Sequence, residues 1–450
     1  MSAGFADALA EVLAFTPEAF ASLGANIKTE WFLEALAAIE GDKHAEMRRR
    51  KLPVERALWL VIGMGLFRDR SIQEVVEHLT LSLPRPGPRA GVAPSAIPQA
   101  RERLGLEPVQ RLFEVSAEVW ARRVAEKDRW HGLSLWGMDG SCLRVPDPAE
   151  NDAAFGRPSS GARDKSGYPQ VRFVGLMALR AHTLAAMSVG GFHQGELTLV
   201  KPLWEKMPEH SLTIVDRGFL SWGPLFHLHA SGAERHWMIR AKASQKLRSV
   251  RRLGPGDSLV EVLPSSAVRR ENPGVPEVFQ ARVISYQVKG YKPQRLITSM
   301  LDAEKYPAEE MAALYHQRWE IELGYDEIKT HMLEREEALR SRKPIGVLQE
   351  VAGIALAYNL VRAEMTRVAE SMGLPPSRIS FRHALMLIRN FCLAAWAASP
   401  GAVPRRLGSF EQDMRLLILP ERRTERSYPR HVKIKMSNYA RNRGKSGWAA

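Results

Sequence analysis

The sequence predicts a mixed α/β protein in which helical regions flank a β-sheet. Two short apolar runs, Leu133 to Met138 and Leu212 to Val215, each end at an aspartate, which is typical of buried strands that deliver a polar group to a sheet edge. Between them lie two β-like runs, 171–179 and 183–189, and a helical pattern at 196–207. We therefore expect a hairpin and a helix between two strands of one mixed sheet, with a polar site at its edge.

The first 125 residues are expected to be helical. After Pro53 the apolar positions recur at helical spacing, and a linker rich in Pro and Gly follows at 84–91. A short predicted helix at 95–104 carries Arg101 and Arg103. A helical array that ends in a basic helix is typical of helix-turn-helix DNA readers, and solvated arginines explain the same pattern equally well.

The region from about 235 to 299 is expected to be β-rich, with strand-like runs broken by turns at 254–256 and 272–274. Its start is basic, because residues 240–252 include six Lys or Arg and no acid. Such a run is usually a solvated face, and a phosphate-facing surface is the alternative. Helical signals return at Ala308 and continue to about Ala369.

The composition indicates an acidic partner. A net charge of +14 over 450 residues is high, and nucleic acid and anionic membranes are the commonest partners of such basic proteins. The longest apolar runs, Ala57 to Phe67 and Val351 to Val361, fall short of the roughly 20 residues that a membrane span needs. The two cysteines, Cys142 and Cys392, have no zinc-ligand spacing and suit a reducing cytoplasm. We therefore expect a cytoplasmic protein that binds nucleic acid and no membrane.

One predicted helix carries the most informative pattern. Four polar residues fall within a single stripe about 60° wide on an ideal α-helix: Tyr315, Arg318, Glu322 and Lys329. A solvent-exposed stripe with an Arg318–Glu322 ion pair at i,i+4 spacing is the alternative to a functional site. Asp326 falls near the same stripe, so periodicity alone leaves Glu322 and Asp326 open as the acid that would act.

These residues carry a resemblance to a known family. The spacing Tyr-x2-Arg-x3-Glu-x6-Lys matches the signature of the DDE transposases of the bacterial insertion-element-four family at all four positions. The motif at Asp139-Gly140-Ser141 resembles the first acidic motif of that family, and Asp216-Arg217-Gly218-Phe219 resembles the second. The segment 56–104 is similar to the family's N-terminal domain, and 428–443 is similar to its C-terminal ending. The resemblance covers most of the chain.

The resemblance implies a ribonuclease H-like catalytic core, and it selects Glu322 over Asp326 as the third acid. It also implies a β-rich insertion between Asp216 and Glu322, where the residue pattern independently predicts strands. We accordingly divide the chain into four parts: a helical N-terminal DNA-binding domain at 1–125, a catalytic domain at 126–370, its insertion at 236–300, and a helical, basic C-terminal region at 371–450.

The function implied by the resemblance is cut-and-paste DNA transposition. The protein would bind the terminal inverted repeats of its insertion sequence, cleave phosphodiester bonds and join the 3′ ends to target DNA. Asp139, Asp216 and Glu322 would be the catalytic residues and would hold two Mg²⁺ ions about 3.5–4 Å apart, with Mn²⁺ as a substitute. The expected partners are double-stranded DNA and a second copy of the chain, in the bacterial cytoplasm at the nucleoid.

The other residues singled out by the resemblance would contact DNA. Tyr315, Arg318 and Lys329 would bind phosphates beside the metals. Arg240 and Lys242 resemble a basic pair that follows the second aspartate in relatives and contacts DNA near the cleavage point.

One departure from the family pattern concerns base stacking. Some relatives place a tryptophan shortly before the Tyr315 position to stack on a flipped base, and here the matching position is near Gln294. Tyr291 and Trp237 are the candidates to replace it, since any aromatic face can stack a base, and an ordinary core role fits both.

Three other functions share these sequence features. The first is a metal-dependent nuclease on the same fold that cuts DNA without joining it. The second is a DNA-binding regulator whose catalytic core has decayed, and the third is a host-domesticated transposase derivative that binds DNA. All three acids and the Tyr-Arg-Glu-Lys set are present, which favours the active transposase.

Overall fold

The computed structural model describes residues 17, 20–24, 26–39, 52–79, 81, 92–158, 167–242, 245, 247–288, 292–334, 338–396 and 403–421. The segment 428–443 and Tyr291, both singled out in the sequence, lie outside these residues.

A single nine-stranded sheet runs through the described chain, in the order β3-β2-β1-β4-β5-β9-β8-β7-β6. Its strands β1, β4 and β5 are parallel to one another, and the other neighbours are antiparallel. The bounds are β1 Ser134–Arg144, β2 Gln170–Ala178, β3 Thr183–Gly191, β4 Ser211–Val215, β5 Arg235–Arg240, β6 Arg248–Gly254, β7 Asp257–Val262, β8 Phe279–Tyr286 and β9 Gln294–Thr298. The predicted hairpin is confirmed as β2 and β3, and the predicted β-rich region supplies β5 to β9 of the same sheet.

The helices before the sheet are α2 Ala21–Gly24, α3 Thr29–Ala37, α5 Val54–Leu66, α6 Ile72–His78, α7 Ala96–Leu104 and α8 Glu107–Lys127. Those within the sheet region are α9 Ala149–Phe155, α10 Glu196–Leu199, α11 Lys201–Trp204, α12 Trp222–Ala230, α13 Ser266–Glu271, α14 Ala308–Tyr315 and α15 Trp319–Asp326. The last three are α16 Pro344–Ser371, α17 Phe381–Trp396 and α18 Val403–Arg415.

Two sequence-based expectations for this region are wrong in detail. The strand that carries Asp139 does not end there but continues to Arg144, because β1 keeps its antiparallel partner β2 after its parallel pairing with β4 has ended at Met138. The single helix expected at 196–207 is two short helices, α10 and α11. Pro202 has no N–H to donate to the preceding turn, so a continuous helix cannot pass through it.

The two faces of the sheet bury separate apolar cores. Leu135 and Ile214 belong to one core cluster, which also includes residues of α14, α15 and α16, whereas Trp136 and Val215 belong to the other. Successive residues of β1 and β4 therefore alternate between the faces, as the two-residue period of a strand requires. The face of Leu135 and Ile214 is the one that positions the candidate site.

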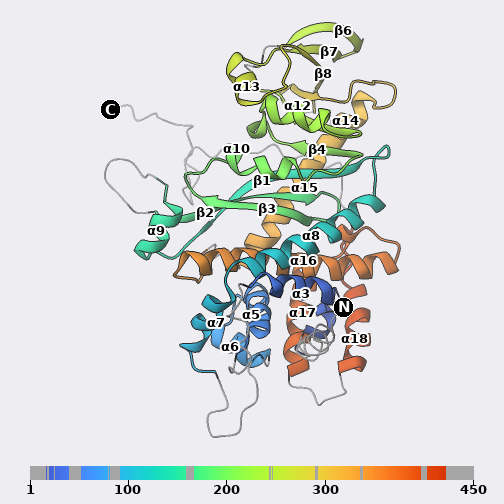
Figure 1. Cartoon of the computed structure of the whole chain (residues 1–450). Helices are drawn as coiled ribbons and strands as arrows, with labels where there is room; N and C mark the ends of the chain where they lie inside the picture. Colours follow the sequence, from blue (N-terminus) through green and yellow to red (C-terminus); the bar gives the residue numbers. More distant parts are fainter. Residues whose placement is uncertain are drawn as a thin grey trace, which may run out of the picture.

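The long helix α16 lies between the sheet and the N-terminal helices α5, α6 and α7 (Figure 1). It packs closely against α5, because a Cβ added at Gly65 would lie 2.8 Å from the Gly353 carbonyl oxygen. By length and hydropathy α16 meets the criteria for a membrane span, yet 78% of its most apolar window is buried within the protein, as in a core helix.

Arg101, one of the two arginines of the predicted basic helix, has a structural role. It is 9% exposed, and its guanidinium donates to the hydroxyl of Ser341 and the carbonyl of Gly346. The Ser341 hydroxyl in turn donates to the buried Glu350 carboxylate, which also pairs with Arg68. These bonds fix α7 and α5 to the start of α16, so Arg101 is not available to read DNA in this conformation.

Candidate active site

Asp139, Asp216 and Arg240 lie at the same level of three adjacent parallel strands, β1, β4 and β5. In the register of β1, β4 and β5, Met138 pairs with Val215 and Val215 pairs with Ile239. Each of the three polar residues follows one of these partners directly. Because side chains alternate along a strand, all three are expected on the face of Ile214, where α14 and α15 pack.

The environment of Asp139 disfavours its charged form. Burial raises the pKa of its carboxyl group to about 6, against the opposing effects of the Gly140 N–H, which donates to Oδ1 at 2.8 Å, and of the Arg318 charge. The negative charges of Glu196 and Asp216 raise it further. Glu196 lies close by, since a Cβ added at Gly140 would meet its Oε1 at 2.4 Å. A cation at this position would relieve the repulsion between these acids.

Asp216 caps the short turn that follows its strand. It is half-buried, and its side chain accepts a hydrogen bond from the Gly218 N–H at the start of a 3-10 turn, Arg217–Phe219. A Cβ at Gly218 would lie 2.8 Å from Oδ1, so the glycine of the Asp-Arg-Gly-Phe motif leaves room for the carboxylate. One oxygen is thereby held in place by the backbone.

The segment that carries the Tyr-Arg-Glu-Lys spacing is not one regular α-helix, which corrects the ideal-helix expectation. Helix α14 ends at Tyr315, a 3-10 turn covers His316–Arg318, α15 follows, and a π-helical turn covers Glu327–Met332. These turns are wound more tightly or more loosely than an α-helix. The four residues therefore do not share one exposed stripe.

Arg318 and Glu322 form an ion pair, with a guanidinium nitrogen 2.8 Å from the carboxylate. The charge of Asp139 also acts on Arg318, so this guanidinium lies within the field of both acids. Asp326 is exposed and accepts a hydrogen bond from the Thr330 hydroxyl at 2.6 Å. Of the two acids left open by periodicity, Glu322 is thus the one linked to the aspartate strands.

Tyr315 is buried, with 7% of its surface exposed, and burial raises the pKa of its phenol to about 12. Its hydroxyl donates to the carbonyl of Val215, the residue before Asp216, at 3.3 Å. The three basic residues are more accessible: Arg240 and Lys329 are half-buried, and Lys242 is exposed. Arg240 lies near the site, because its charge lowers the pKa of Tyr315 against the effect of burial.

Four residues near these groups escaped the sequence-based reasoning. Glu196 begins a short helix whose role no motif indicates, and Tyr325 lies three residues after Glu322 in what reads as a core position. Trp319 is 50% exposed beside Arg318, whose guanidinium lies 5.2 Å from the ring centroid. In the sequence, the signal for this residue is a tryptophan directly after the motif arginine.

The fourth is Tyr286, which bears on the question of base stacking. Gln294, at the position where some relatives have a tryptophan, pairs with Tyr286 across β8 and β9. The charges of Arg240 and Arg318 act on the Tyr286 phenol, whose pKa is raised by burial. Trp237 is 1% exposed and belongs to the core on the other face. Of Tyr286 and Trp237, Tyr286 is therefore the partly accessible aromatic beside the site.

The described residues contain no group of three or more His, Cys, Asp or Glu side chains close enough together to hold a metal ion. The donor set itself suits a hard divalent cation, because Asp139, Asp216 and Glu322 offer only carboxylate oxygens. In this conformation Glu322 is held by Arg318 instead. The chemistry of the three acids fits a hard divalent cation, and binding of one ion by all three would require Glu322 to exchange its ion pair with Arg318 for the metal.

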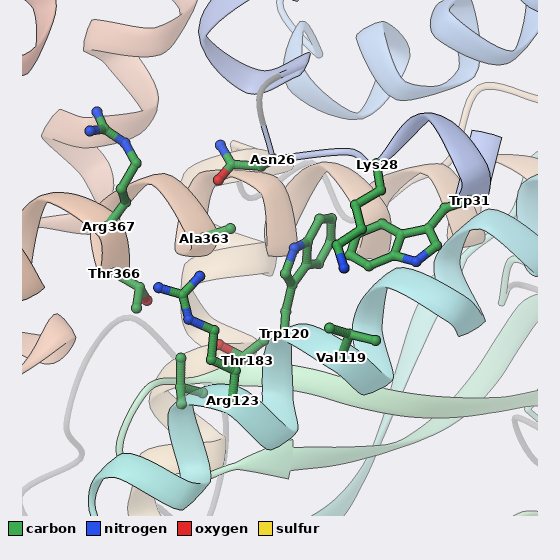
Figure 2. A pocket seen from close by; sticks show the side chains of 11 residues that line it. Asn26, Lys28, Trp31, Val119, Trp120, Arg123, Thr183, Ala363, Thr366 and Arg367 are labelled. Atoms are coloured by element: carbon green, nitrogen blue, oxygen red, sulfur yellow. The ribbon is translucent and has the colours of Figure 1, made fainter. Parts of the chain in front are cut away.

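A pocket of about 350 Å³ lies elsewhere, among α3, α8, α16 and the start of β3 (Figure 2). Two tryptophans, Trp31 and Trp120, and the cations Lys28, Arg123 and Arg367 are among its lining residues. None of the predicted site residues lines it, so the carboxylate site is separate from this cavity.

Comparison with known proteins finds matches over most of the chain. Residues 17–114 match the family described as the N-terminal region of insertion element 4 transposases, and residues 131–360 match the transposase DDE domain. The chain is 40% identical over 394 residues, 87% of this chain and 88% of the relative, to the transposase InsG for insertion sequence element IS4 of Escherichia coli strain K12.

A cryo-EM structure of the piggyBac transposase synaptic complex with hairpin DNA is similar at 14% identity and a TM-score of 0.44, covering 91% of this chain and 87% of that one. This likeness is too slight to carry an argument. The family matches and the extended identity to InsG are sufficient: the chain belongs to the IS4 family of DDE transposases.

Proposed function

We propose that this DNA-binding transposase acts by cut-and-paste: it binds the terminal inverted repeats of its insertion sequence, cleaves there and joins the 3′ ends to target DNA. The observation that carries the proposal is the register of the parallel strands, which puts Asp139 and Asp216 side by side under the helix that bears Glu322. Three carboxylates from separate segments are the groups that metal-assisted phosphodiester cleavage requires.

Asp139, Asp216 and Glu322 would together hold the divalent metal ions that DDE transposase domains generally use; we propose two Mg²⁺, replaceable by Mn²⁺. When bound by these three acids, such ions would supply activation of the attacking oxygen and stabilisation of the leaving oxygen. The chain's own contribution is to hold the oxygens at fixed positions: the Gly140 and Gly218 N–H groups each orient one aspartate. Arg318 keeps Glu322 away from the aspartates until DNA phosphate takes its guanidinium.

The DNA-binding set that we propose is Tyr315, Arg318, Lys329, Arg240 and Lys242. Arg318 and Arg240 are supported by their position beside the carboxylates, and Lys242 by its exposure. Tyr315 would have to exchange its hydrogen bond to the Val215 carbonyl for one to phosphate. Trp319 and Tyr286 add aromatic faces next to these cations, on which an unpaired base can stack.

The order β3-β2-β1-β4-β5, with β1, β4 and β5 parallel, supports a ribonuclease H-like core. The proposed division has a DNA-binding domain at 1–125, a catalytic domain at 126–370 and a C-terminal region at 371–450. The insertion expected at 236–300 then begins after Arg240, because β5 belongs to the parallel core. Two transposon ends must be held together for joining, so we propose a homodimer assembled on DNA. Its place of action would be the bacterial cytoplasm, at the nucleoid.

Strand transfer from a linear donor tests this proposal. The donor carries the inverted repeats that flank the gene, the target is a supercoiled plasmid, and Mg²⁺ is the metal. We expect cleavage at the repeat ends and donor–target joints, both abolished by a chelator. Cleavage without joints would favour a nuclease on the same fold. Repeat binding without cleavage, unchanged in Asp139→Ala, would favour a domesticated DNA-binding protein.

A further inference from the structure

Tyr325 forms a bridge between the helix of Glu322 and the strand of Asp139. It lies three residues after Glu322 on α15 and is 6% exposed. Its ring packs edge-on against Phe173 of β2, with the ring centroids 5.3 Å apart. The hydroxyl donates to the Asp139 carbonyl at 2.7 Å and accepts from the Gly175 N–H at 2.9 Å.

The position of this bridge in the sheet is specific. Asp139 and Gly175 are direct partners in the antiparallel pairing of β1 and β2. One hydroxyl from a helix therefore contacts both members of the pair that carries a catalytic acid. Gly175 leaves room for it, since a Cβ at this position would lie 2.7 Å from the Tyr325 oxygen.

Such a bridge constrains the position of α15, which carries Glu322, relative to the strand that carries Asp139. The Tyr325 hydroxyl and the Gly175 N–H are buried and the bond to the Asp139 carbonyl is partly buried. A buried polar group that loses its partner is costly, so sliding of the helix along the strands is disfavoured because it would break these bonds. Carboxylates that share metal ions must keep their separation, because misplacement by about 1 Å can lower a rate about 100-fold.

We propose that Tyr325, together with the absence of a side chain at Gly175, positions Glu322 relative to Asp139 for DNA cleavage. Tyr325 touches neither DNA nor a reacting group; it acts through the backbone of Asp139. This inference rests on the proposed function, in which Asp139 and Glu322 act on the same phosphodiester.

The experiment is a double-mutant cycle with Tyr325→Phe and Gly175→Ala in the full-length protein. Tyr325→Phe removes only the hydroxyl, and Gly175→Ala displaces it. Tyr358→Phe is the matched control, because Tyr358 is also buried and its hydroxyl donates at 2.9 Å to Glu327 rather than to a strand that carries a proposed catalytic acid. The measurements are the melting temperature, the affinity for a repeat-end duplex, the rate of first-strand cleavage at saturating protein, and its dependence on Mg²⁺ concentration.

We expect each single variant to cleave at least about tenfold more slowly and to need more Mg²⁺, with end affinity within about twofold. The double variant should lose little more than either single one, because both remove the same bridge. Tyr358→Phe should match the loss of melting temperature yet cleave within about twofold of the unmodified protein. Equal cleavage losses in Tyr325→Phe and Tyr358→Phe, or additive losses in the cycle, would overturn the inference.

Failure of the proposed function gives a different pattern. In that case the unmodified protein itself does not cleave the repeat ends with Mg²⁺ or Mn²⁺. The bridge is then tested by calorimetric titration with Mn²⁺ and by amide hydrogen exchange at 136–142. Weaker Mn²⁺ binding and faster exchange in Tyr325→Phe, but not in Tyr358→Phe, would support it, and equal behaviour of the two variants would refute it.

Discussion

Asp139 and Asp216 each follow one member of the parallel pair Met138–Val215, so the two acids leave neighbouring strands side by side. Their proximity is set by the backbone register, which the apolar residues on both faces of the sheet maintain. The third acid arrives on a helix held by contacts to the same strands. Strand register therefore determines the positions of the two aspartates, whereas the packing of α15 on the sheet determines the position of Glu322.

Glu322 and Asp326 should differ sharply in function. Glu322→Gln should abolish cleavage of repeat-end DNA while end binding is retained, because the variant loses the carboxylate proposed to bind metal and keeps the size of the side chain. Asp326→Asn, on the same helix but exposed and bonded only to Thr330, is the matched control and should cleave normally. A gel assay of cleavage at saturating protein measures both variants. Loss of cleavage in Asp326→Asn but not in Glu322→Gln would show that Asp326, rather than Glu322, is the third acid.

Arg318→Gln should weaken end binding and reduce the slope of log affinity against log salt by about 1, as loss of one phosphate contact does. The variant also frees Glu322 from its ion pair. Arg123→Gln is the control, since Arg123 is exposed and pairs with Glu370 outside the site. Fluorescence anisotropy over a range of salt concentrations gives the slopes. An unchanged slope in Arg318→Gln would mean that this arginine serves Glu322 alone.

The stability of the protein should fall on acidification, partly through His236. Burial lowers the pKa of this histidine from 6.5 to about 4, and His229 adds to the effect. Between these pH values the unfolded chain binds a proton that the folded chain does not. The free energy of unfolding is therefore not reduced by His236 above pH 6.5. As the pH falls from 6.5 toward 4, protonation of His236 in the unfolded chain lowers this free energy by at most about 3 kcal/mol.

Urea unfolding at several pH values between 7.5 and 4.5 measures this dependence. His236→Asn should unfold with a shallower loss of free energy over the same range than the unmodified protein. Identical pH profiles would show that His236 is protonated equally in the folded and unfolded chains.

Arg362→Ala should destabilise the protein by about 3–5 kcal/mol, because it leaves the largely buried Glu327 carboxylate without its guanidinium partner. Although burial raises the pKa of Glu327, the Arg362 guanidinium, with a smaller contribution from His182, lowers it to about 2. The double variant Arg362→Met with Glu327→Gln should recover much of the loss, since no unpaired charge remains. Chemical unfolding of the variants decides, and a loss in the double variant as large as in Arg362→Ala would contradict the explanation.

The sequence allowed the main features of the fold and site to be predicted where local signals are strong. The hairpin of β2 and β3 follows from apolar runs and short spacing, and the neighbouring positions of Asp139 and Asp216 follow from their place after two apolar runs. The catalytic role of the three acids, drawn from their motifs, stays a prediction. The extension of β1 beyond Asp139 could not be predicted, because it depends on which neighbour continues the pairing. The burial of Arg101 and Tyr315 depends on contacts with residues about 245 and 100 positions away.

The winding of the Tyr-Arg-Glu-Lys segment could not be predicted either, because it depends on packing against distant parts of the chain. A helical pattern reports an average period, whereas the 3-10 turn at His316–Arg318 and the π turn at Glu327–Met332 are local departures set by packing. Glu327 in the π turn pairs with Arg362 of α16, a contact between segments far apart in sequence. The bridge of Tyr325 to Asp139 and Gly175 likewise joins three segments, so no single sequence motif predicts it.

The most direct test of the central claim, that Asp139, Asp216 and Glu322 form one metal-binding catalytic set, is metal rescue of cysteine variants. Asp139→Cys, Asp216→Cys and Glu322→Cys are assayed for cleavage of repeat-end DNA with Mg²⁺ and with Mn²⁺. A thiolate is a poor ligand for Mg²⁺ and a better one for softer ions. The account predicts that the variants bind DNA, fail to cleave with Mg²⁺ and recover cleavage with Mn²⁺. Cleavage by any of the three at the unmodified rate with Mg²⁺ would contradict it.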